Sequence, residues 1–542
     1  RLSLQANVGV NLTSTTKANV RLNAQVLDYS GSAAGTDAIY QGIFEAPPVM
    51  FAPVLPAQNG EDYILFGNRN GGPIAGRYRN PYAEMVRGYS EKNESTMIAS
   101  LDLEQDLKFI VPGLKAKGLV SFKNWATTNV VRSFTPYFYG IKDYELGTNG
   151  EYNYTYEAIT KGSKALTTTT SNGGDRLLNY QLSLDYAQTF GDKHDVGAML
   201  VYLQRDYNEN APADFYATLP VRNQGIAGRV TYSYKDRYFI EGNFGYNGSE
   251  NFAPKKRFGF FPSAAIGYMI SNEAFWEPIS HIVSVLKFKG SYGIIGNDQI
   301  GGNRRFAFNS EMADVNGYTF GTTGGNPISG IGTGYPGNPY VSWEEAKKMN
   351  IGVELELYNS LKLNVDYFHE RRSGIFIERG AVPSVVGVNV NPYLNLGEME
   401  NKGVDASLEY YKTINKDWNI SVRGNFTYNR NKKLYDDQPS TNYPYKDVIG
   451  KPWNQQFGYI ALGYFRTESE IQNSPKQIGN PRVGDLKYKD INGDGIVDTD
   501  DYVAIGRTAI PEINYGFGAN ISYKDFDVAF FFQGIGNVTG FI

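Results

Sequence analysis

The sequence predicts an all-β fold, and within that class a transmembrane antiparallel β-barrel, from three observations. The chain of 542 residues is rich in residue types that strands and turns use, with 60 Gly, 41 Tyr and 31 Phe. Apolar and polar residues alternate along repeated pairs of short segments, which is the pattern of β-hairpins. Tight turns within these pairs alternate with much longer connections between them, as in membrane barrels with short turns at one end and long loops at the other.

The first hairpin shows the alternation most clearly. From residue 2 to residue 26, apolar side chains occupy the even positions on both sides of a polar turn, and the odd positions carry mainly Ser, Gln, Asn and Arg. One face is therefore apolar and the other amide-rich, which suits strands between lipid and a wet interior. The same unit returns in residues 180–186 with 196–202, 230–234 with 238–246, 404–410 with 420–428, and 513–523 with 526–532. Weaker pairs after Thr96, Phe258 and Asn350 bring the expected total to about sixteen strands.

Four long connections separate these hairpins. They cover about residues 28–95, 126–179, 294–349 and 432–512. A soluble β-sandwich also alternates, but its loops do not divide into a short set and a long set. We therefore expect residues 1–542 to form part of a single outer-membrane barrel domain with long extracellular loops.

Composition excludes several other classes. A net charge of −4 gives no electrostatic case for nucleic acid, and the absence of cysteine rules out disulfides and thiolate metal sites. No apolar run approaches twenty residues, so no transmembrane helix is expected. The three histidines form no spacing with carboxylates that indicates zinc or a hydrolytic triad. Glu344 and Glu345 are interpreted as a solvated face rather than a glycosidase pair, so we expect no enzyme.

Residues 490–501, DINGDGIVDTDD, have the spacing of a calcium-binding loop. Ca²⁺ prefers oxygen ligands, which an EF-hand-type loop presents at positions 1, 3, 5, 7, 9 and 12, with glycine at position 6. The candidate ligands are Asp490, Asn492, Asp494, Ile496 through its carbonyl, Asp498 and Asp501, with Gly495 at the turn. The flanks do not predict helices, so helix-loop-helix geometry is a poor fit. We expect a structural Ca²⁺ that braces the extracellular loop 432–512, and the alternative is an Asx-rich surface turn without metal.

Several stretches resemble the SusC/RagA class of TonB-dependent outer-membrane transporters. The similar stretches, in order along the chain, are residues 228–276, 286–298 (LKFKGSYGIIGND), 338–357, 395–410, 484–506 and 515–534. Proteins of this class carry an N-terminal regulatory domain, a TonB-contacting segment and a plug before a barrel of about 22 strands. About sixteen strands cannot close such a barrel. We therefore expect this segment to be the middle of a longer protein, without the plug and the last C-terminal strands.

The resemblance implies active import across the bacterial outer membrane. The implied cargo is an oligosaccharide from glycan breakdown or, alternatively, an oligopeptide. The implied partners are a SusD-like surface lipoprotein, the TonB complex through the missing N-terminal region, and outer-membrane lipid, with a dimer of transporter–lipoprotein pairs as one possible assembly. A passive porin and a non-transporting, calcium-braced surface adhesin remain as alternatives.

Loop aromatics are the candidate cargo contacts, because sugars stack on aromatic faces. The candidates are Tyr137, Tyr139, Tyr152, Tyr154 and Tyr156, beside Phe138. The competing interpretation is an aromatic girdle at the membrane interface, where tyrosines near strand ends are common. The basic clusters 255–257 and 371–372 are candidates for anionic cargo or lipopolysaccharide, against the simpler interpretation of solvated charges.

Overall fold

The computed structural model describes residues 1–46, 49–57, 60, 62–72, 74, 76–148, 150–212, 215–300, 305–322, 324–387, 390–439 and 441–540. Strands dominate these residues, and the α-helices among them are short: α1 (Gly35–Glu45), α2 (Pro81–Val86) and α3 (Glu468–Gln472). None of the helices in these ranges is long and apolar enough to cross a membrane. The all-β prediction is confirmed.

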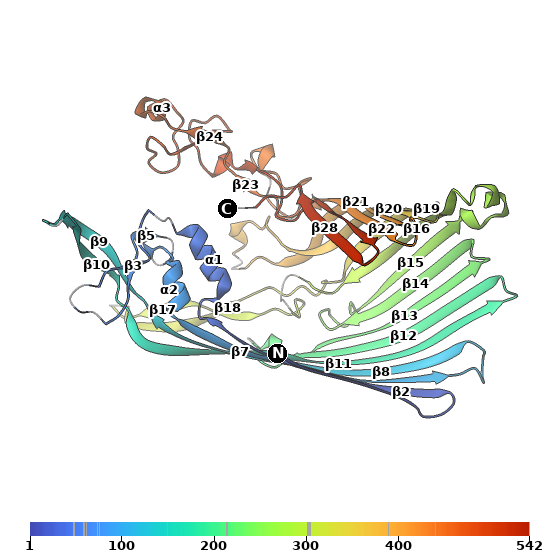
Figure 1. Ribbon diagram of the computed structural model, residues 1–542. Helices are drawn as coiled ribbons and strands as arrows, with labels where there is room; N and C mark the ends of the chain where they lie inside the picture. The colour runs from blue at the N-terminus through green and yellow to red at the C-terminus, as the bar shows by residue number, and fades with distance from the viewer. Residues whose placement is uncertain are drawn as a thin grey trace. The chain divides into compact units, whose positions relative to one another are not determined.

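Sixteen strands form one antiparallel sheet, in which every strand is paired with the main strands before and after it in the chain (Figure 1). They are β1 (Leu2–Asn11), β2 (Thr16–Ser32), β7 (Gly88–Asp106), β8 (Leu114–Thr135), β11 (Ser163–Phe190), β12 (His194–Glu209), β13 (Val221–Tyr234), β14 (Tyr238–Ser249), β15 (Phe258–Met269), β16 (Val283–Asn297), β19 (Glu344–Leu357), β20 (Leu361–Glu378), β21 (Tyr393–Thr413), β22 (Trp418–Tyr435), β27 (Ile513–Tyr523) and β28 (Phe526–Gly536). The alternation test therefore found the main strands correctly.

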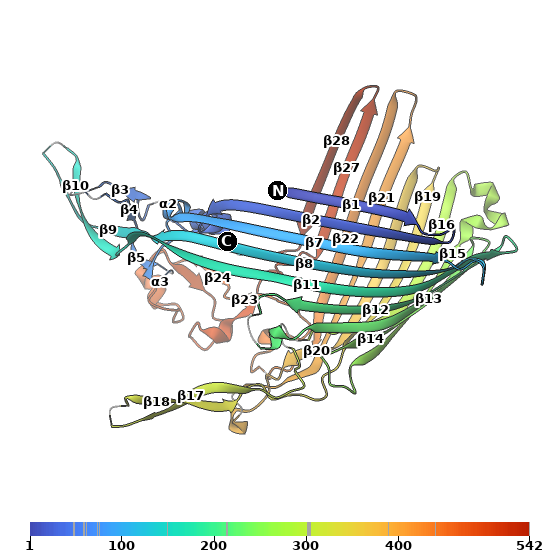
Figure 2. The ribbon, with the colours of Figure 1, turned by 90° about the horizontal axis from the view of Figure 1, so that it is seen from below.

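The chain divides into two compact units. Unit 1 contains residues 1–106, 117–182 and 204–222, and unit 2 contains residues 107–116, 183–203 and 223–542. In unit 1, β1 pairs with β2 and β2 with β7, and these strands lie side by side in Figure 2. Unit 2 holds the continuous antiparallel ladder from β13 through β16 and from β19 through β22 to β27 and β28.

Turn length divides the two ends of the unit 2 strands. At one end, the turn end, the connections are tight: residues 235–237, 358–360, 414–417 and 524–525. Non-glycine residues with positive φ, such as Lys235 and Asp236, make these reversals. The connection 270–282 is the longer one at this end, with the short 3₁₀ helices η2 (Ile270–Asn272) and η3 (Ala274–Ile279).

The opposite end, the loop end, carries the long connections, including 298–343, 379–392 and 436–512 in unit 2. Two of them, 298–343 and 436–512, were predicted and are shorter than expected, because the strands continue past the predicted boundaries. For example, the predicted connection 294–349 loses its ends to β16 and β19. We call the membrane-crossing part of the strands, where one face is apolar, the apolar belt. Beyond this belt both faces of a strand are polar, so the alternation of apolar and polar residues disappears from the sequence although the backbone pairing continues.

The loops contain small sheets that the sequence did not predict. Unit 1 has a four-stranded sheet in the order β10 (Tyr152–Thr160), β9 (Tyr137–Leu146), β4 (Leu65–Gly67) and β3 (Val54–Leu55), and a pair β5 (Asn70–Gly72) with β6 (Gly76–Arg77). Unit 2 has the pairs β17 (Met312–Phe320) with β18 (Asn326–Thr333), β23 (Phe457–Gly458) with β26 (Val503–Ala504), and β24 (Ala461–Tyr464) with β25 (Leu486–Tyr488). Figure 2 shows the β17–β18 hairpin projecting beyond the ends of the neighbouring unit 2 strands.

The two buried apolar clusters among the described residues lie mainly outside the sixteen main strands, and only Phe376, on β20, belongs to one of these strands. One contains Phe66, Ala83 and Phe138 in unit 1, and the other contains Phe252, Ile300, Val341 and Phe376 in unit 2. Along the strands, large apolar side chains are instead exposed, as at Phe260 and Ile351. An apolar outer face on paired strands is what lipid contact requires.

The division between turn end and loop end predicts which segments are reached from outside the cell. The chain contains no cysteine, so single substitutions can report on topology. In whole cells, Ser469→Cys in α3 should react with a membrane-impermeant maleimide, because long loops of such barrels are extracellular. Lys416→Cys, in the turn 414–417, should react only after lysis. The reverse labelling pattern would contradict the assignment, and the unsubstituted protein gives the background.

Candidate functional site

The connection 436–512 is a folded lobe, although it contains few regular elements. Beside the pairs β23–β26 and β24–β25, it has the 3₁₀ turns η5 (Pro444–Lys446) and η6 (Thr499–Asp501), and a bridge joins Lys476 to Ile496. Phe465 and Val497 are buried within it. The sequence-predicted boundary at 432 moves to 436, because β22 extends to Tyr435.

The predicted calcium loop lies in this lobe and is folded by its own side chains. The two oxygens of Asp490 accept hydrogen bonds from the backbone amides of Gly493 (2.7 Å) and Gly495 (2.9 Å). In the same way, Asn492 accepts from the amide of Asp494, and Asp494 accepts from the amide of Ile496. Both glycines have positive φ, which lets the chain wrap around these side chains.

Asp501, the last candidate ligand, is fully buried. Its Oδ1 accepts from the amides of Ile491 (2.6 Å) and Asn492 (3.3 Å), and its Oδ2 accepts from that of Asp498 (2.9 Å). Burial raises the pKa of the Asp501 carboxyl, but the amide hydrogen bonds outweigh burial and hold this pKa below its ordinary value of 3.8. The charged form of Asp501 therefore stabilises the closed loop. This stabilisation is lost as the pH falls below the ordinary carboxyl range.

Residues 443–446, near the start of the connection 436–512, contact the acidic loop, which is the name we use for residues 490–501. The Tyr445 hydroxyl donates to the carbonyl of Asp500 (2.7 Å), and the Lys446 ammonium pairs with the Asp500 carboxylate (2.6 Å). Tyr443 stacks on Tyr445 with ring centroids 5.3 Å apart. These contacts fix the acidic loop to residues 443–446, far away in sequence.

The donor chemistry of this loop suits a hard cation, since it consists of carboxylate, amide and carbonyl oxygens. Within the described ranges, however, no group of three or more Asp, Glu, His or Cys side chains converges on one point. Asp501 in particular directs its oxygens at backbone amides. The geometry thus presents a wrapped, preformed acidic turn, and occupancy by metal stays a prediction.

The five candidate cargo tyrosines lie on the β9–β10 hairpin of unit 1, and the structure separates them. Tyr137 stacks on Tyr63 with centroids 4.0 Å apart, and the Tyr139 hydroxyl lies 3.2 Å from that of Tyr63. Tyr156 is half-buried. Tyr152 and Tyr154 are more open, at 53% and 38% exposed. Tyr137 and Tyr139 therefore pack against Tyr63, whereas Tyr152 and Tyr154 keep more of their surface exposed.

Tyr152 and Tyr154 belong to an exposed apolar surface, which we call the aromatic arm. Its members are Tyr144, Leu146, Tyr152 and Tyr154, from paired positions of β9 and β10. Tyr144 and Tyr152 meet edge to face at 5.6 Å. Sequence reasoning missed Tyr144, because only the pairing of β9 with β10 places it opposite Tyr154.

The aromatic arm is anchored by the buried cluster at its base. Phe138 packs against Phe66, and Arg77 lies over the Phe138 ring with its guanidinium carbon 4.3 Å from the centroid. Asn80, fully buried, donates to the carbonyls of Pro53 (2.8 Å) and Gly67 (2.9 Å) and caps helix α2. These contacts bury the start of β9, whereas its far end is exposed.

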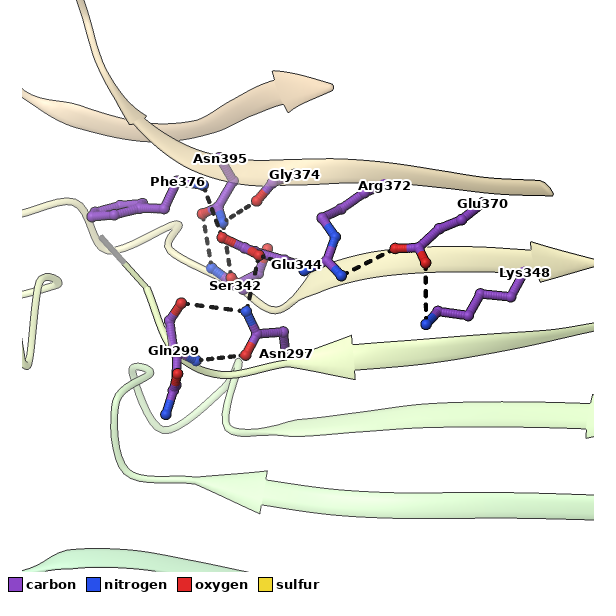
Figure 3. Close-up of polar contacts among 10 residues, drawn as sticks. All are labelled: Asn297, Gln299, Ser342, Glu344, Lys348, Glu370, Arg372, Gly374, Phe376 and Asn395. Carbon is purple, nitrogen blue, oxygen red and sulfur yellow. Dashed lines mark hydrogen bonds and ion pairs between the residues drawn. The ribbon is translucent and has the colours of Figure 1, made fainter. Parts of the chain in front are cut away.

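A buried polar junction forms where β16, β19, β20 and β21 meet the loops of unit 2, as Figure 3 shows. At its centre Glu344, only 7% exposed, accepts from the Asn297 amide (3.0 Å) and the Phe376 backbone N–H (3.4 Å). Arg372 lies 3.6 Å from the same carboxylate and also binds Glu370. The prediction that Glu344 is solvated was wrong, although its neighbour Glu345 is exposed as expected.

Asn395 completes the junction from the β21 side. Its side-chain amide donates to the carbonyls of Ser342 (2.9 Å) and Gly374 (2.8 Å), and its oxygen accepts from the Ser342 N–H. Gly374 has a φ of +67° at a register shift between β20 and β21, where the ladder is interrupted. Glu344 and Asn395 thus replace ladder hydrogen bonds with side-chain bonds at the base of the connection 298–343.

Paired antiparallel strands with an apolar outer face, and with the long connections of unit 2 at one end, are typical of a transmembrane β-barrel protein. Residues 51–534 match the family model described as TonB dependent receptor-like, beta-barrel. This match covers most of the chain, so the chain belongs to that family of outer-membrane proteins.

Curated relatives and a solved structure agree with this assignment. TonB-dependent receptor P26 of Formosa agariphila is 24% identical over 98% of this chain and 52% of its own length. TonB-dependent receptor SusC of Bacteroides thetaiotaomicron is 25% identical over 83% of this chain and 44% of its own length. The chain therefore spans about half the length of these relatives. The RagAB peptide importer in its closed-closed state matches with a TM-score of 0.68 at 18% identity, over 99% of this chain and 58% of that one, which shows a shared fold.

The contacts of the junction predict that alanine substitution of Glu344 destabilises the protein much more than alanine substitution of its neighbour Glu345. Glu344→Ala should lower the free energy of unfolding of the folded protein by about 1–3 kcal/mol, because it leaves the Asn297 amide, the Phe376 N–H and Arg372 without their acceptor. Urea unfolding followed by tryptophan fluorescence measures the change. Glu345→Ala is the matched control and should have almost no effect, and equal effects of the two substitutions would contradict the assigned role of Glu344.

Proposed function

We propose that the full-length protein imports oligosaccharides, the products of glycan breakdown, across the outer membrane with energy from the TonB complex. The observation that carries this proposal is the family match over residues 51–534, and the similarity to the receptor named SusC supports it. In this proposal the barrel provides the passage, and a SusD-like surface lipoprotein covers the loop end.

The aromatic arm supports a carbohydrate cargo. Tyr144, Tyr152 and Tyr154 expose ring faces on one hairpin, and such faces stack on the apolar faces of sugar rings. The arm is held at its base by buried packing, so little order is lost when a ligand binds. Tyr152 and Tyr154 are the proposed contacts, while Tyr137, Tyr139 and Tyr156 support them.

An oligopeptide is the second candidate cargo, because β10 is an edge strand. It is the outermost strand of its sheet, in the order β10, β9, β4, β3, and most of its residues are exposed. An extended peptide can pair with a free strand edge through backbone hydrogen bonds. The structurally similar RagAB is described as a peptide importer, which adds weight to this alternative.

Uptake measurements separate these cargos and test the role of the arm. In cells that express the full-length protein, Tyr152→Ala with Tyr154→Ala should raise the oligosaccharide concentration for half-maximal uptake by about tenfold, since two stacking contacts are lost. Uptake of labelled oligosaccharides and of labelled peptides is compared in the same strains.

Tyr340→Ala is the control, because Tyr340 is also a highly exposed tyrosine but lies outside the arm. Oligosaccharide uptake that does not depend on the gene would refute the proposed import. Gene-dependent uptake of peptides alone would transfer the function to the second candidate. Import that is unchanged in the double variant would remove the arm from the cargo path.

A structural Ca²⁺ in the lobe 436–512 is part of the proposal. Asp490, Asn492, Asp494 and Asp498, with the Ile496 carbonyl and Asp501, are the residues that would hold it. The wrapped turn and its positive-φ glycines support this assignment. Bound Ca²⁺ would neutralise the clustered carboxylates and keep the lobe closed, which is a bracing role and not a sensing one.

Limited proteolysis tests the metal directly. Asp490→Ala with Asp494→Ala should raise the cleavage rate of the lobe about tenfold in millimolar Ca²⁺, and chelation should raise the wild-type rate to a similar level. The control is Glu468→Ala, which removes an exposed carboxylate of the same lobe outside residues 490–501 and should leave the cleavage rate at the wild-type value. If chelation leaves wild-type cleavage unchanged, the loop is an acidic turn without metal.

A further inference from the structure

The outer face of β19–β22 changes from apolar to basic near the loop end. On β20, Leu363, Val365 and Tyr367 share the outward parity, and the next residues of this parity are His369 and Arg371. A strand that leaves the hydrocarbon keeps its two-residue period, so these charged side chains continue the lipid-facing row.

Strand register extends this change across four strands. The last row dominated by apolar side chains is Ile351, Tyr367, Val404 and Tyr428. The next row is Met349, His369, Lys402 and Arg430, followed by Lys347, Arg371, Glu400 and Lys432. Successive rows lie about 7 Å apart. The two outer rows form a charged band directly above the apolar belt.

We call the cations of this band, Lys347, Arg371, Lys402, Arg430 and Lys432, the basic rim. Some of them are already paired: Arg371 with Glu398 (2.7 Å), Lys432 with Glu400 (2.9 Å) and Arg430 with Glu512 (3.5 Å). His369 also contacts Glu400, at 2.9 Å.

Lys347 and Lys402 differ from the other cations of the rim. Both are exposed, and among the residues that the structure describes neither lies within ion-pair distance of a carboxylate, although Lys402 interacts electrostatically with Glu400 at longer range. They lie on β19 and β21, on either side of Arg371 of β20, because Lys347 pairs with Arg371 and Lys402 with His369. The whole chain has a net charge of −4, so this excess of positive charge is a local feature.

We propose that the basic rim binds the phosphate groups of lipopolysaccharide in the outer leaflet. The basic rim lies directly beyond the apolar belt, which is the level at which lipid headgroups begin. Tyr367 and Tyr428, in the row below, are the kind of side chain that marks this interface. Clustered Lys and Arg at that level attract anionic headgroups.

The outward direction of the rim also distinguishes it from a cargo site. Its residues share the face of Ile351 and Val365, whereas the interior parity of β20 carries Asn364, Asp366 and Glu370. The inference rests on the loop end facing outside the cell and is independent of which cargo is imported.

Lipopolysaccharide that remains on the purified full-length protein provides the first test. Lys347→Ala with Lys402→Ala should lower the amount retained per protein roughly threefold or more, because unpaired cations supply the phosphate contacts. The control is Lys412→Ala with Lys416→Ala. Lys412 shares the outward parity of Lys402 on β21 but lies at the turn end, so this variant should retain the wild-type amount.

Two further measurements test whether binding depends on the positive charge of the rim and on the phosphate groups of the lipid. Lys347→Arg with Lys402→Arg should retain lipopolysaccharide, since the charges persist. Wild-type protein in detergent should bind lipid A more tightly than dephosphorylated lipid A, and this test needs no variant to fold. Wild-type retention by the alanine variant, equal loss in the control, or equal affinity for the two lipids would overturn the proposal.

Discussion

Backbone hydrogen bonding in a medium without water is the constraint on which the structure depends. Every N–H and C=O in the hydrocarbon must find a partner within the protein, which favours paired antiparallel strands. Once the backbone is satisfied by its neighbours, side chains need only alternate between lipid and interior. From β19 through β22 to β27 the register is accordingly continuous over most of each strand, and its shifts, at residues 372–376 and 398–399, lie near the loop end.

Beyond the apolar belt this constraint is weaker, and side chains there form hydrogen bonds with backbone groups that strand pairing leaves unsatisfied. Glu344 and Asn395 satisfy backbone groups where β20 shifts register, and Asp501 does the same for the amides of the acidic loop. Buried polar groups of this kind hold a loop in one shape, because an unsatisfied partner is costly. The loop end is therefore both the irregular part of the molecule and the part with defined surfaces.

The sequence predicted whatever depends on local periodicity. Alternation located the sixteen main strands and the tight turns, and the spacing of residues 490–501 located a wrapped acidic turn. Contacts between distant segments left no such signal. Glu344 looked solvated because its partners Asn297 and Phe376 come from other strands, and the tyrosines of β9 and β10 could not be divided without Tyr63. Strand ends were misplaced where both faces become polar.

The most direct test of this account measures the two faces of a single strand. Spin labels placed singly at Leu363, Val365 and Tyr367, and at Asn364 and Asp366, of the full-length protein in lipid would report collisions with oxygen and with a water-soluble nickel complex. The account predicts a two-residue period, with oxygen collisions highest at the odd positions. Collision rates that vary smoothly along β20, without this period, would contradict a membrane-spanning strand and with it the assignment of the outer face.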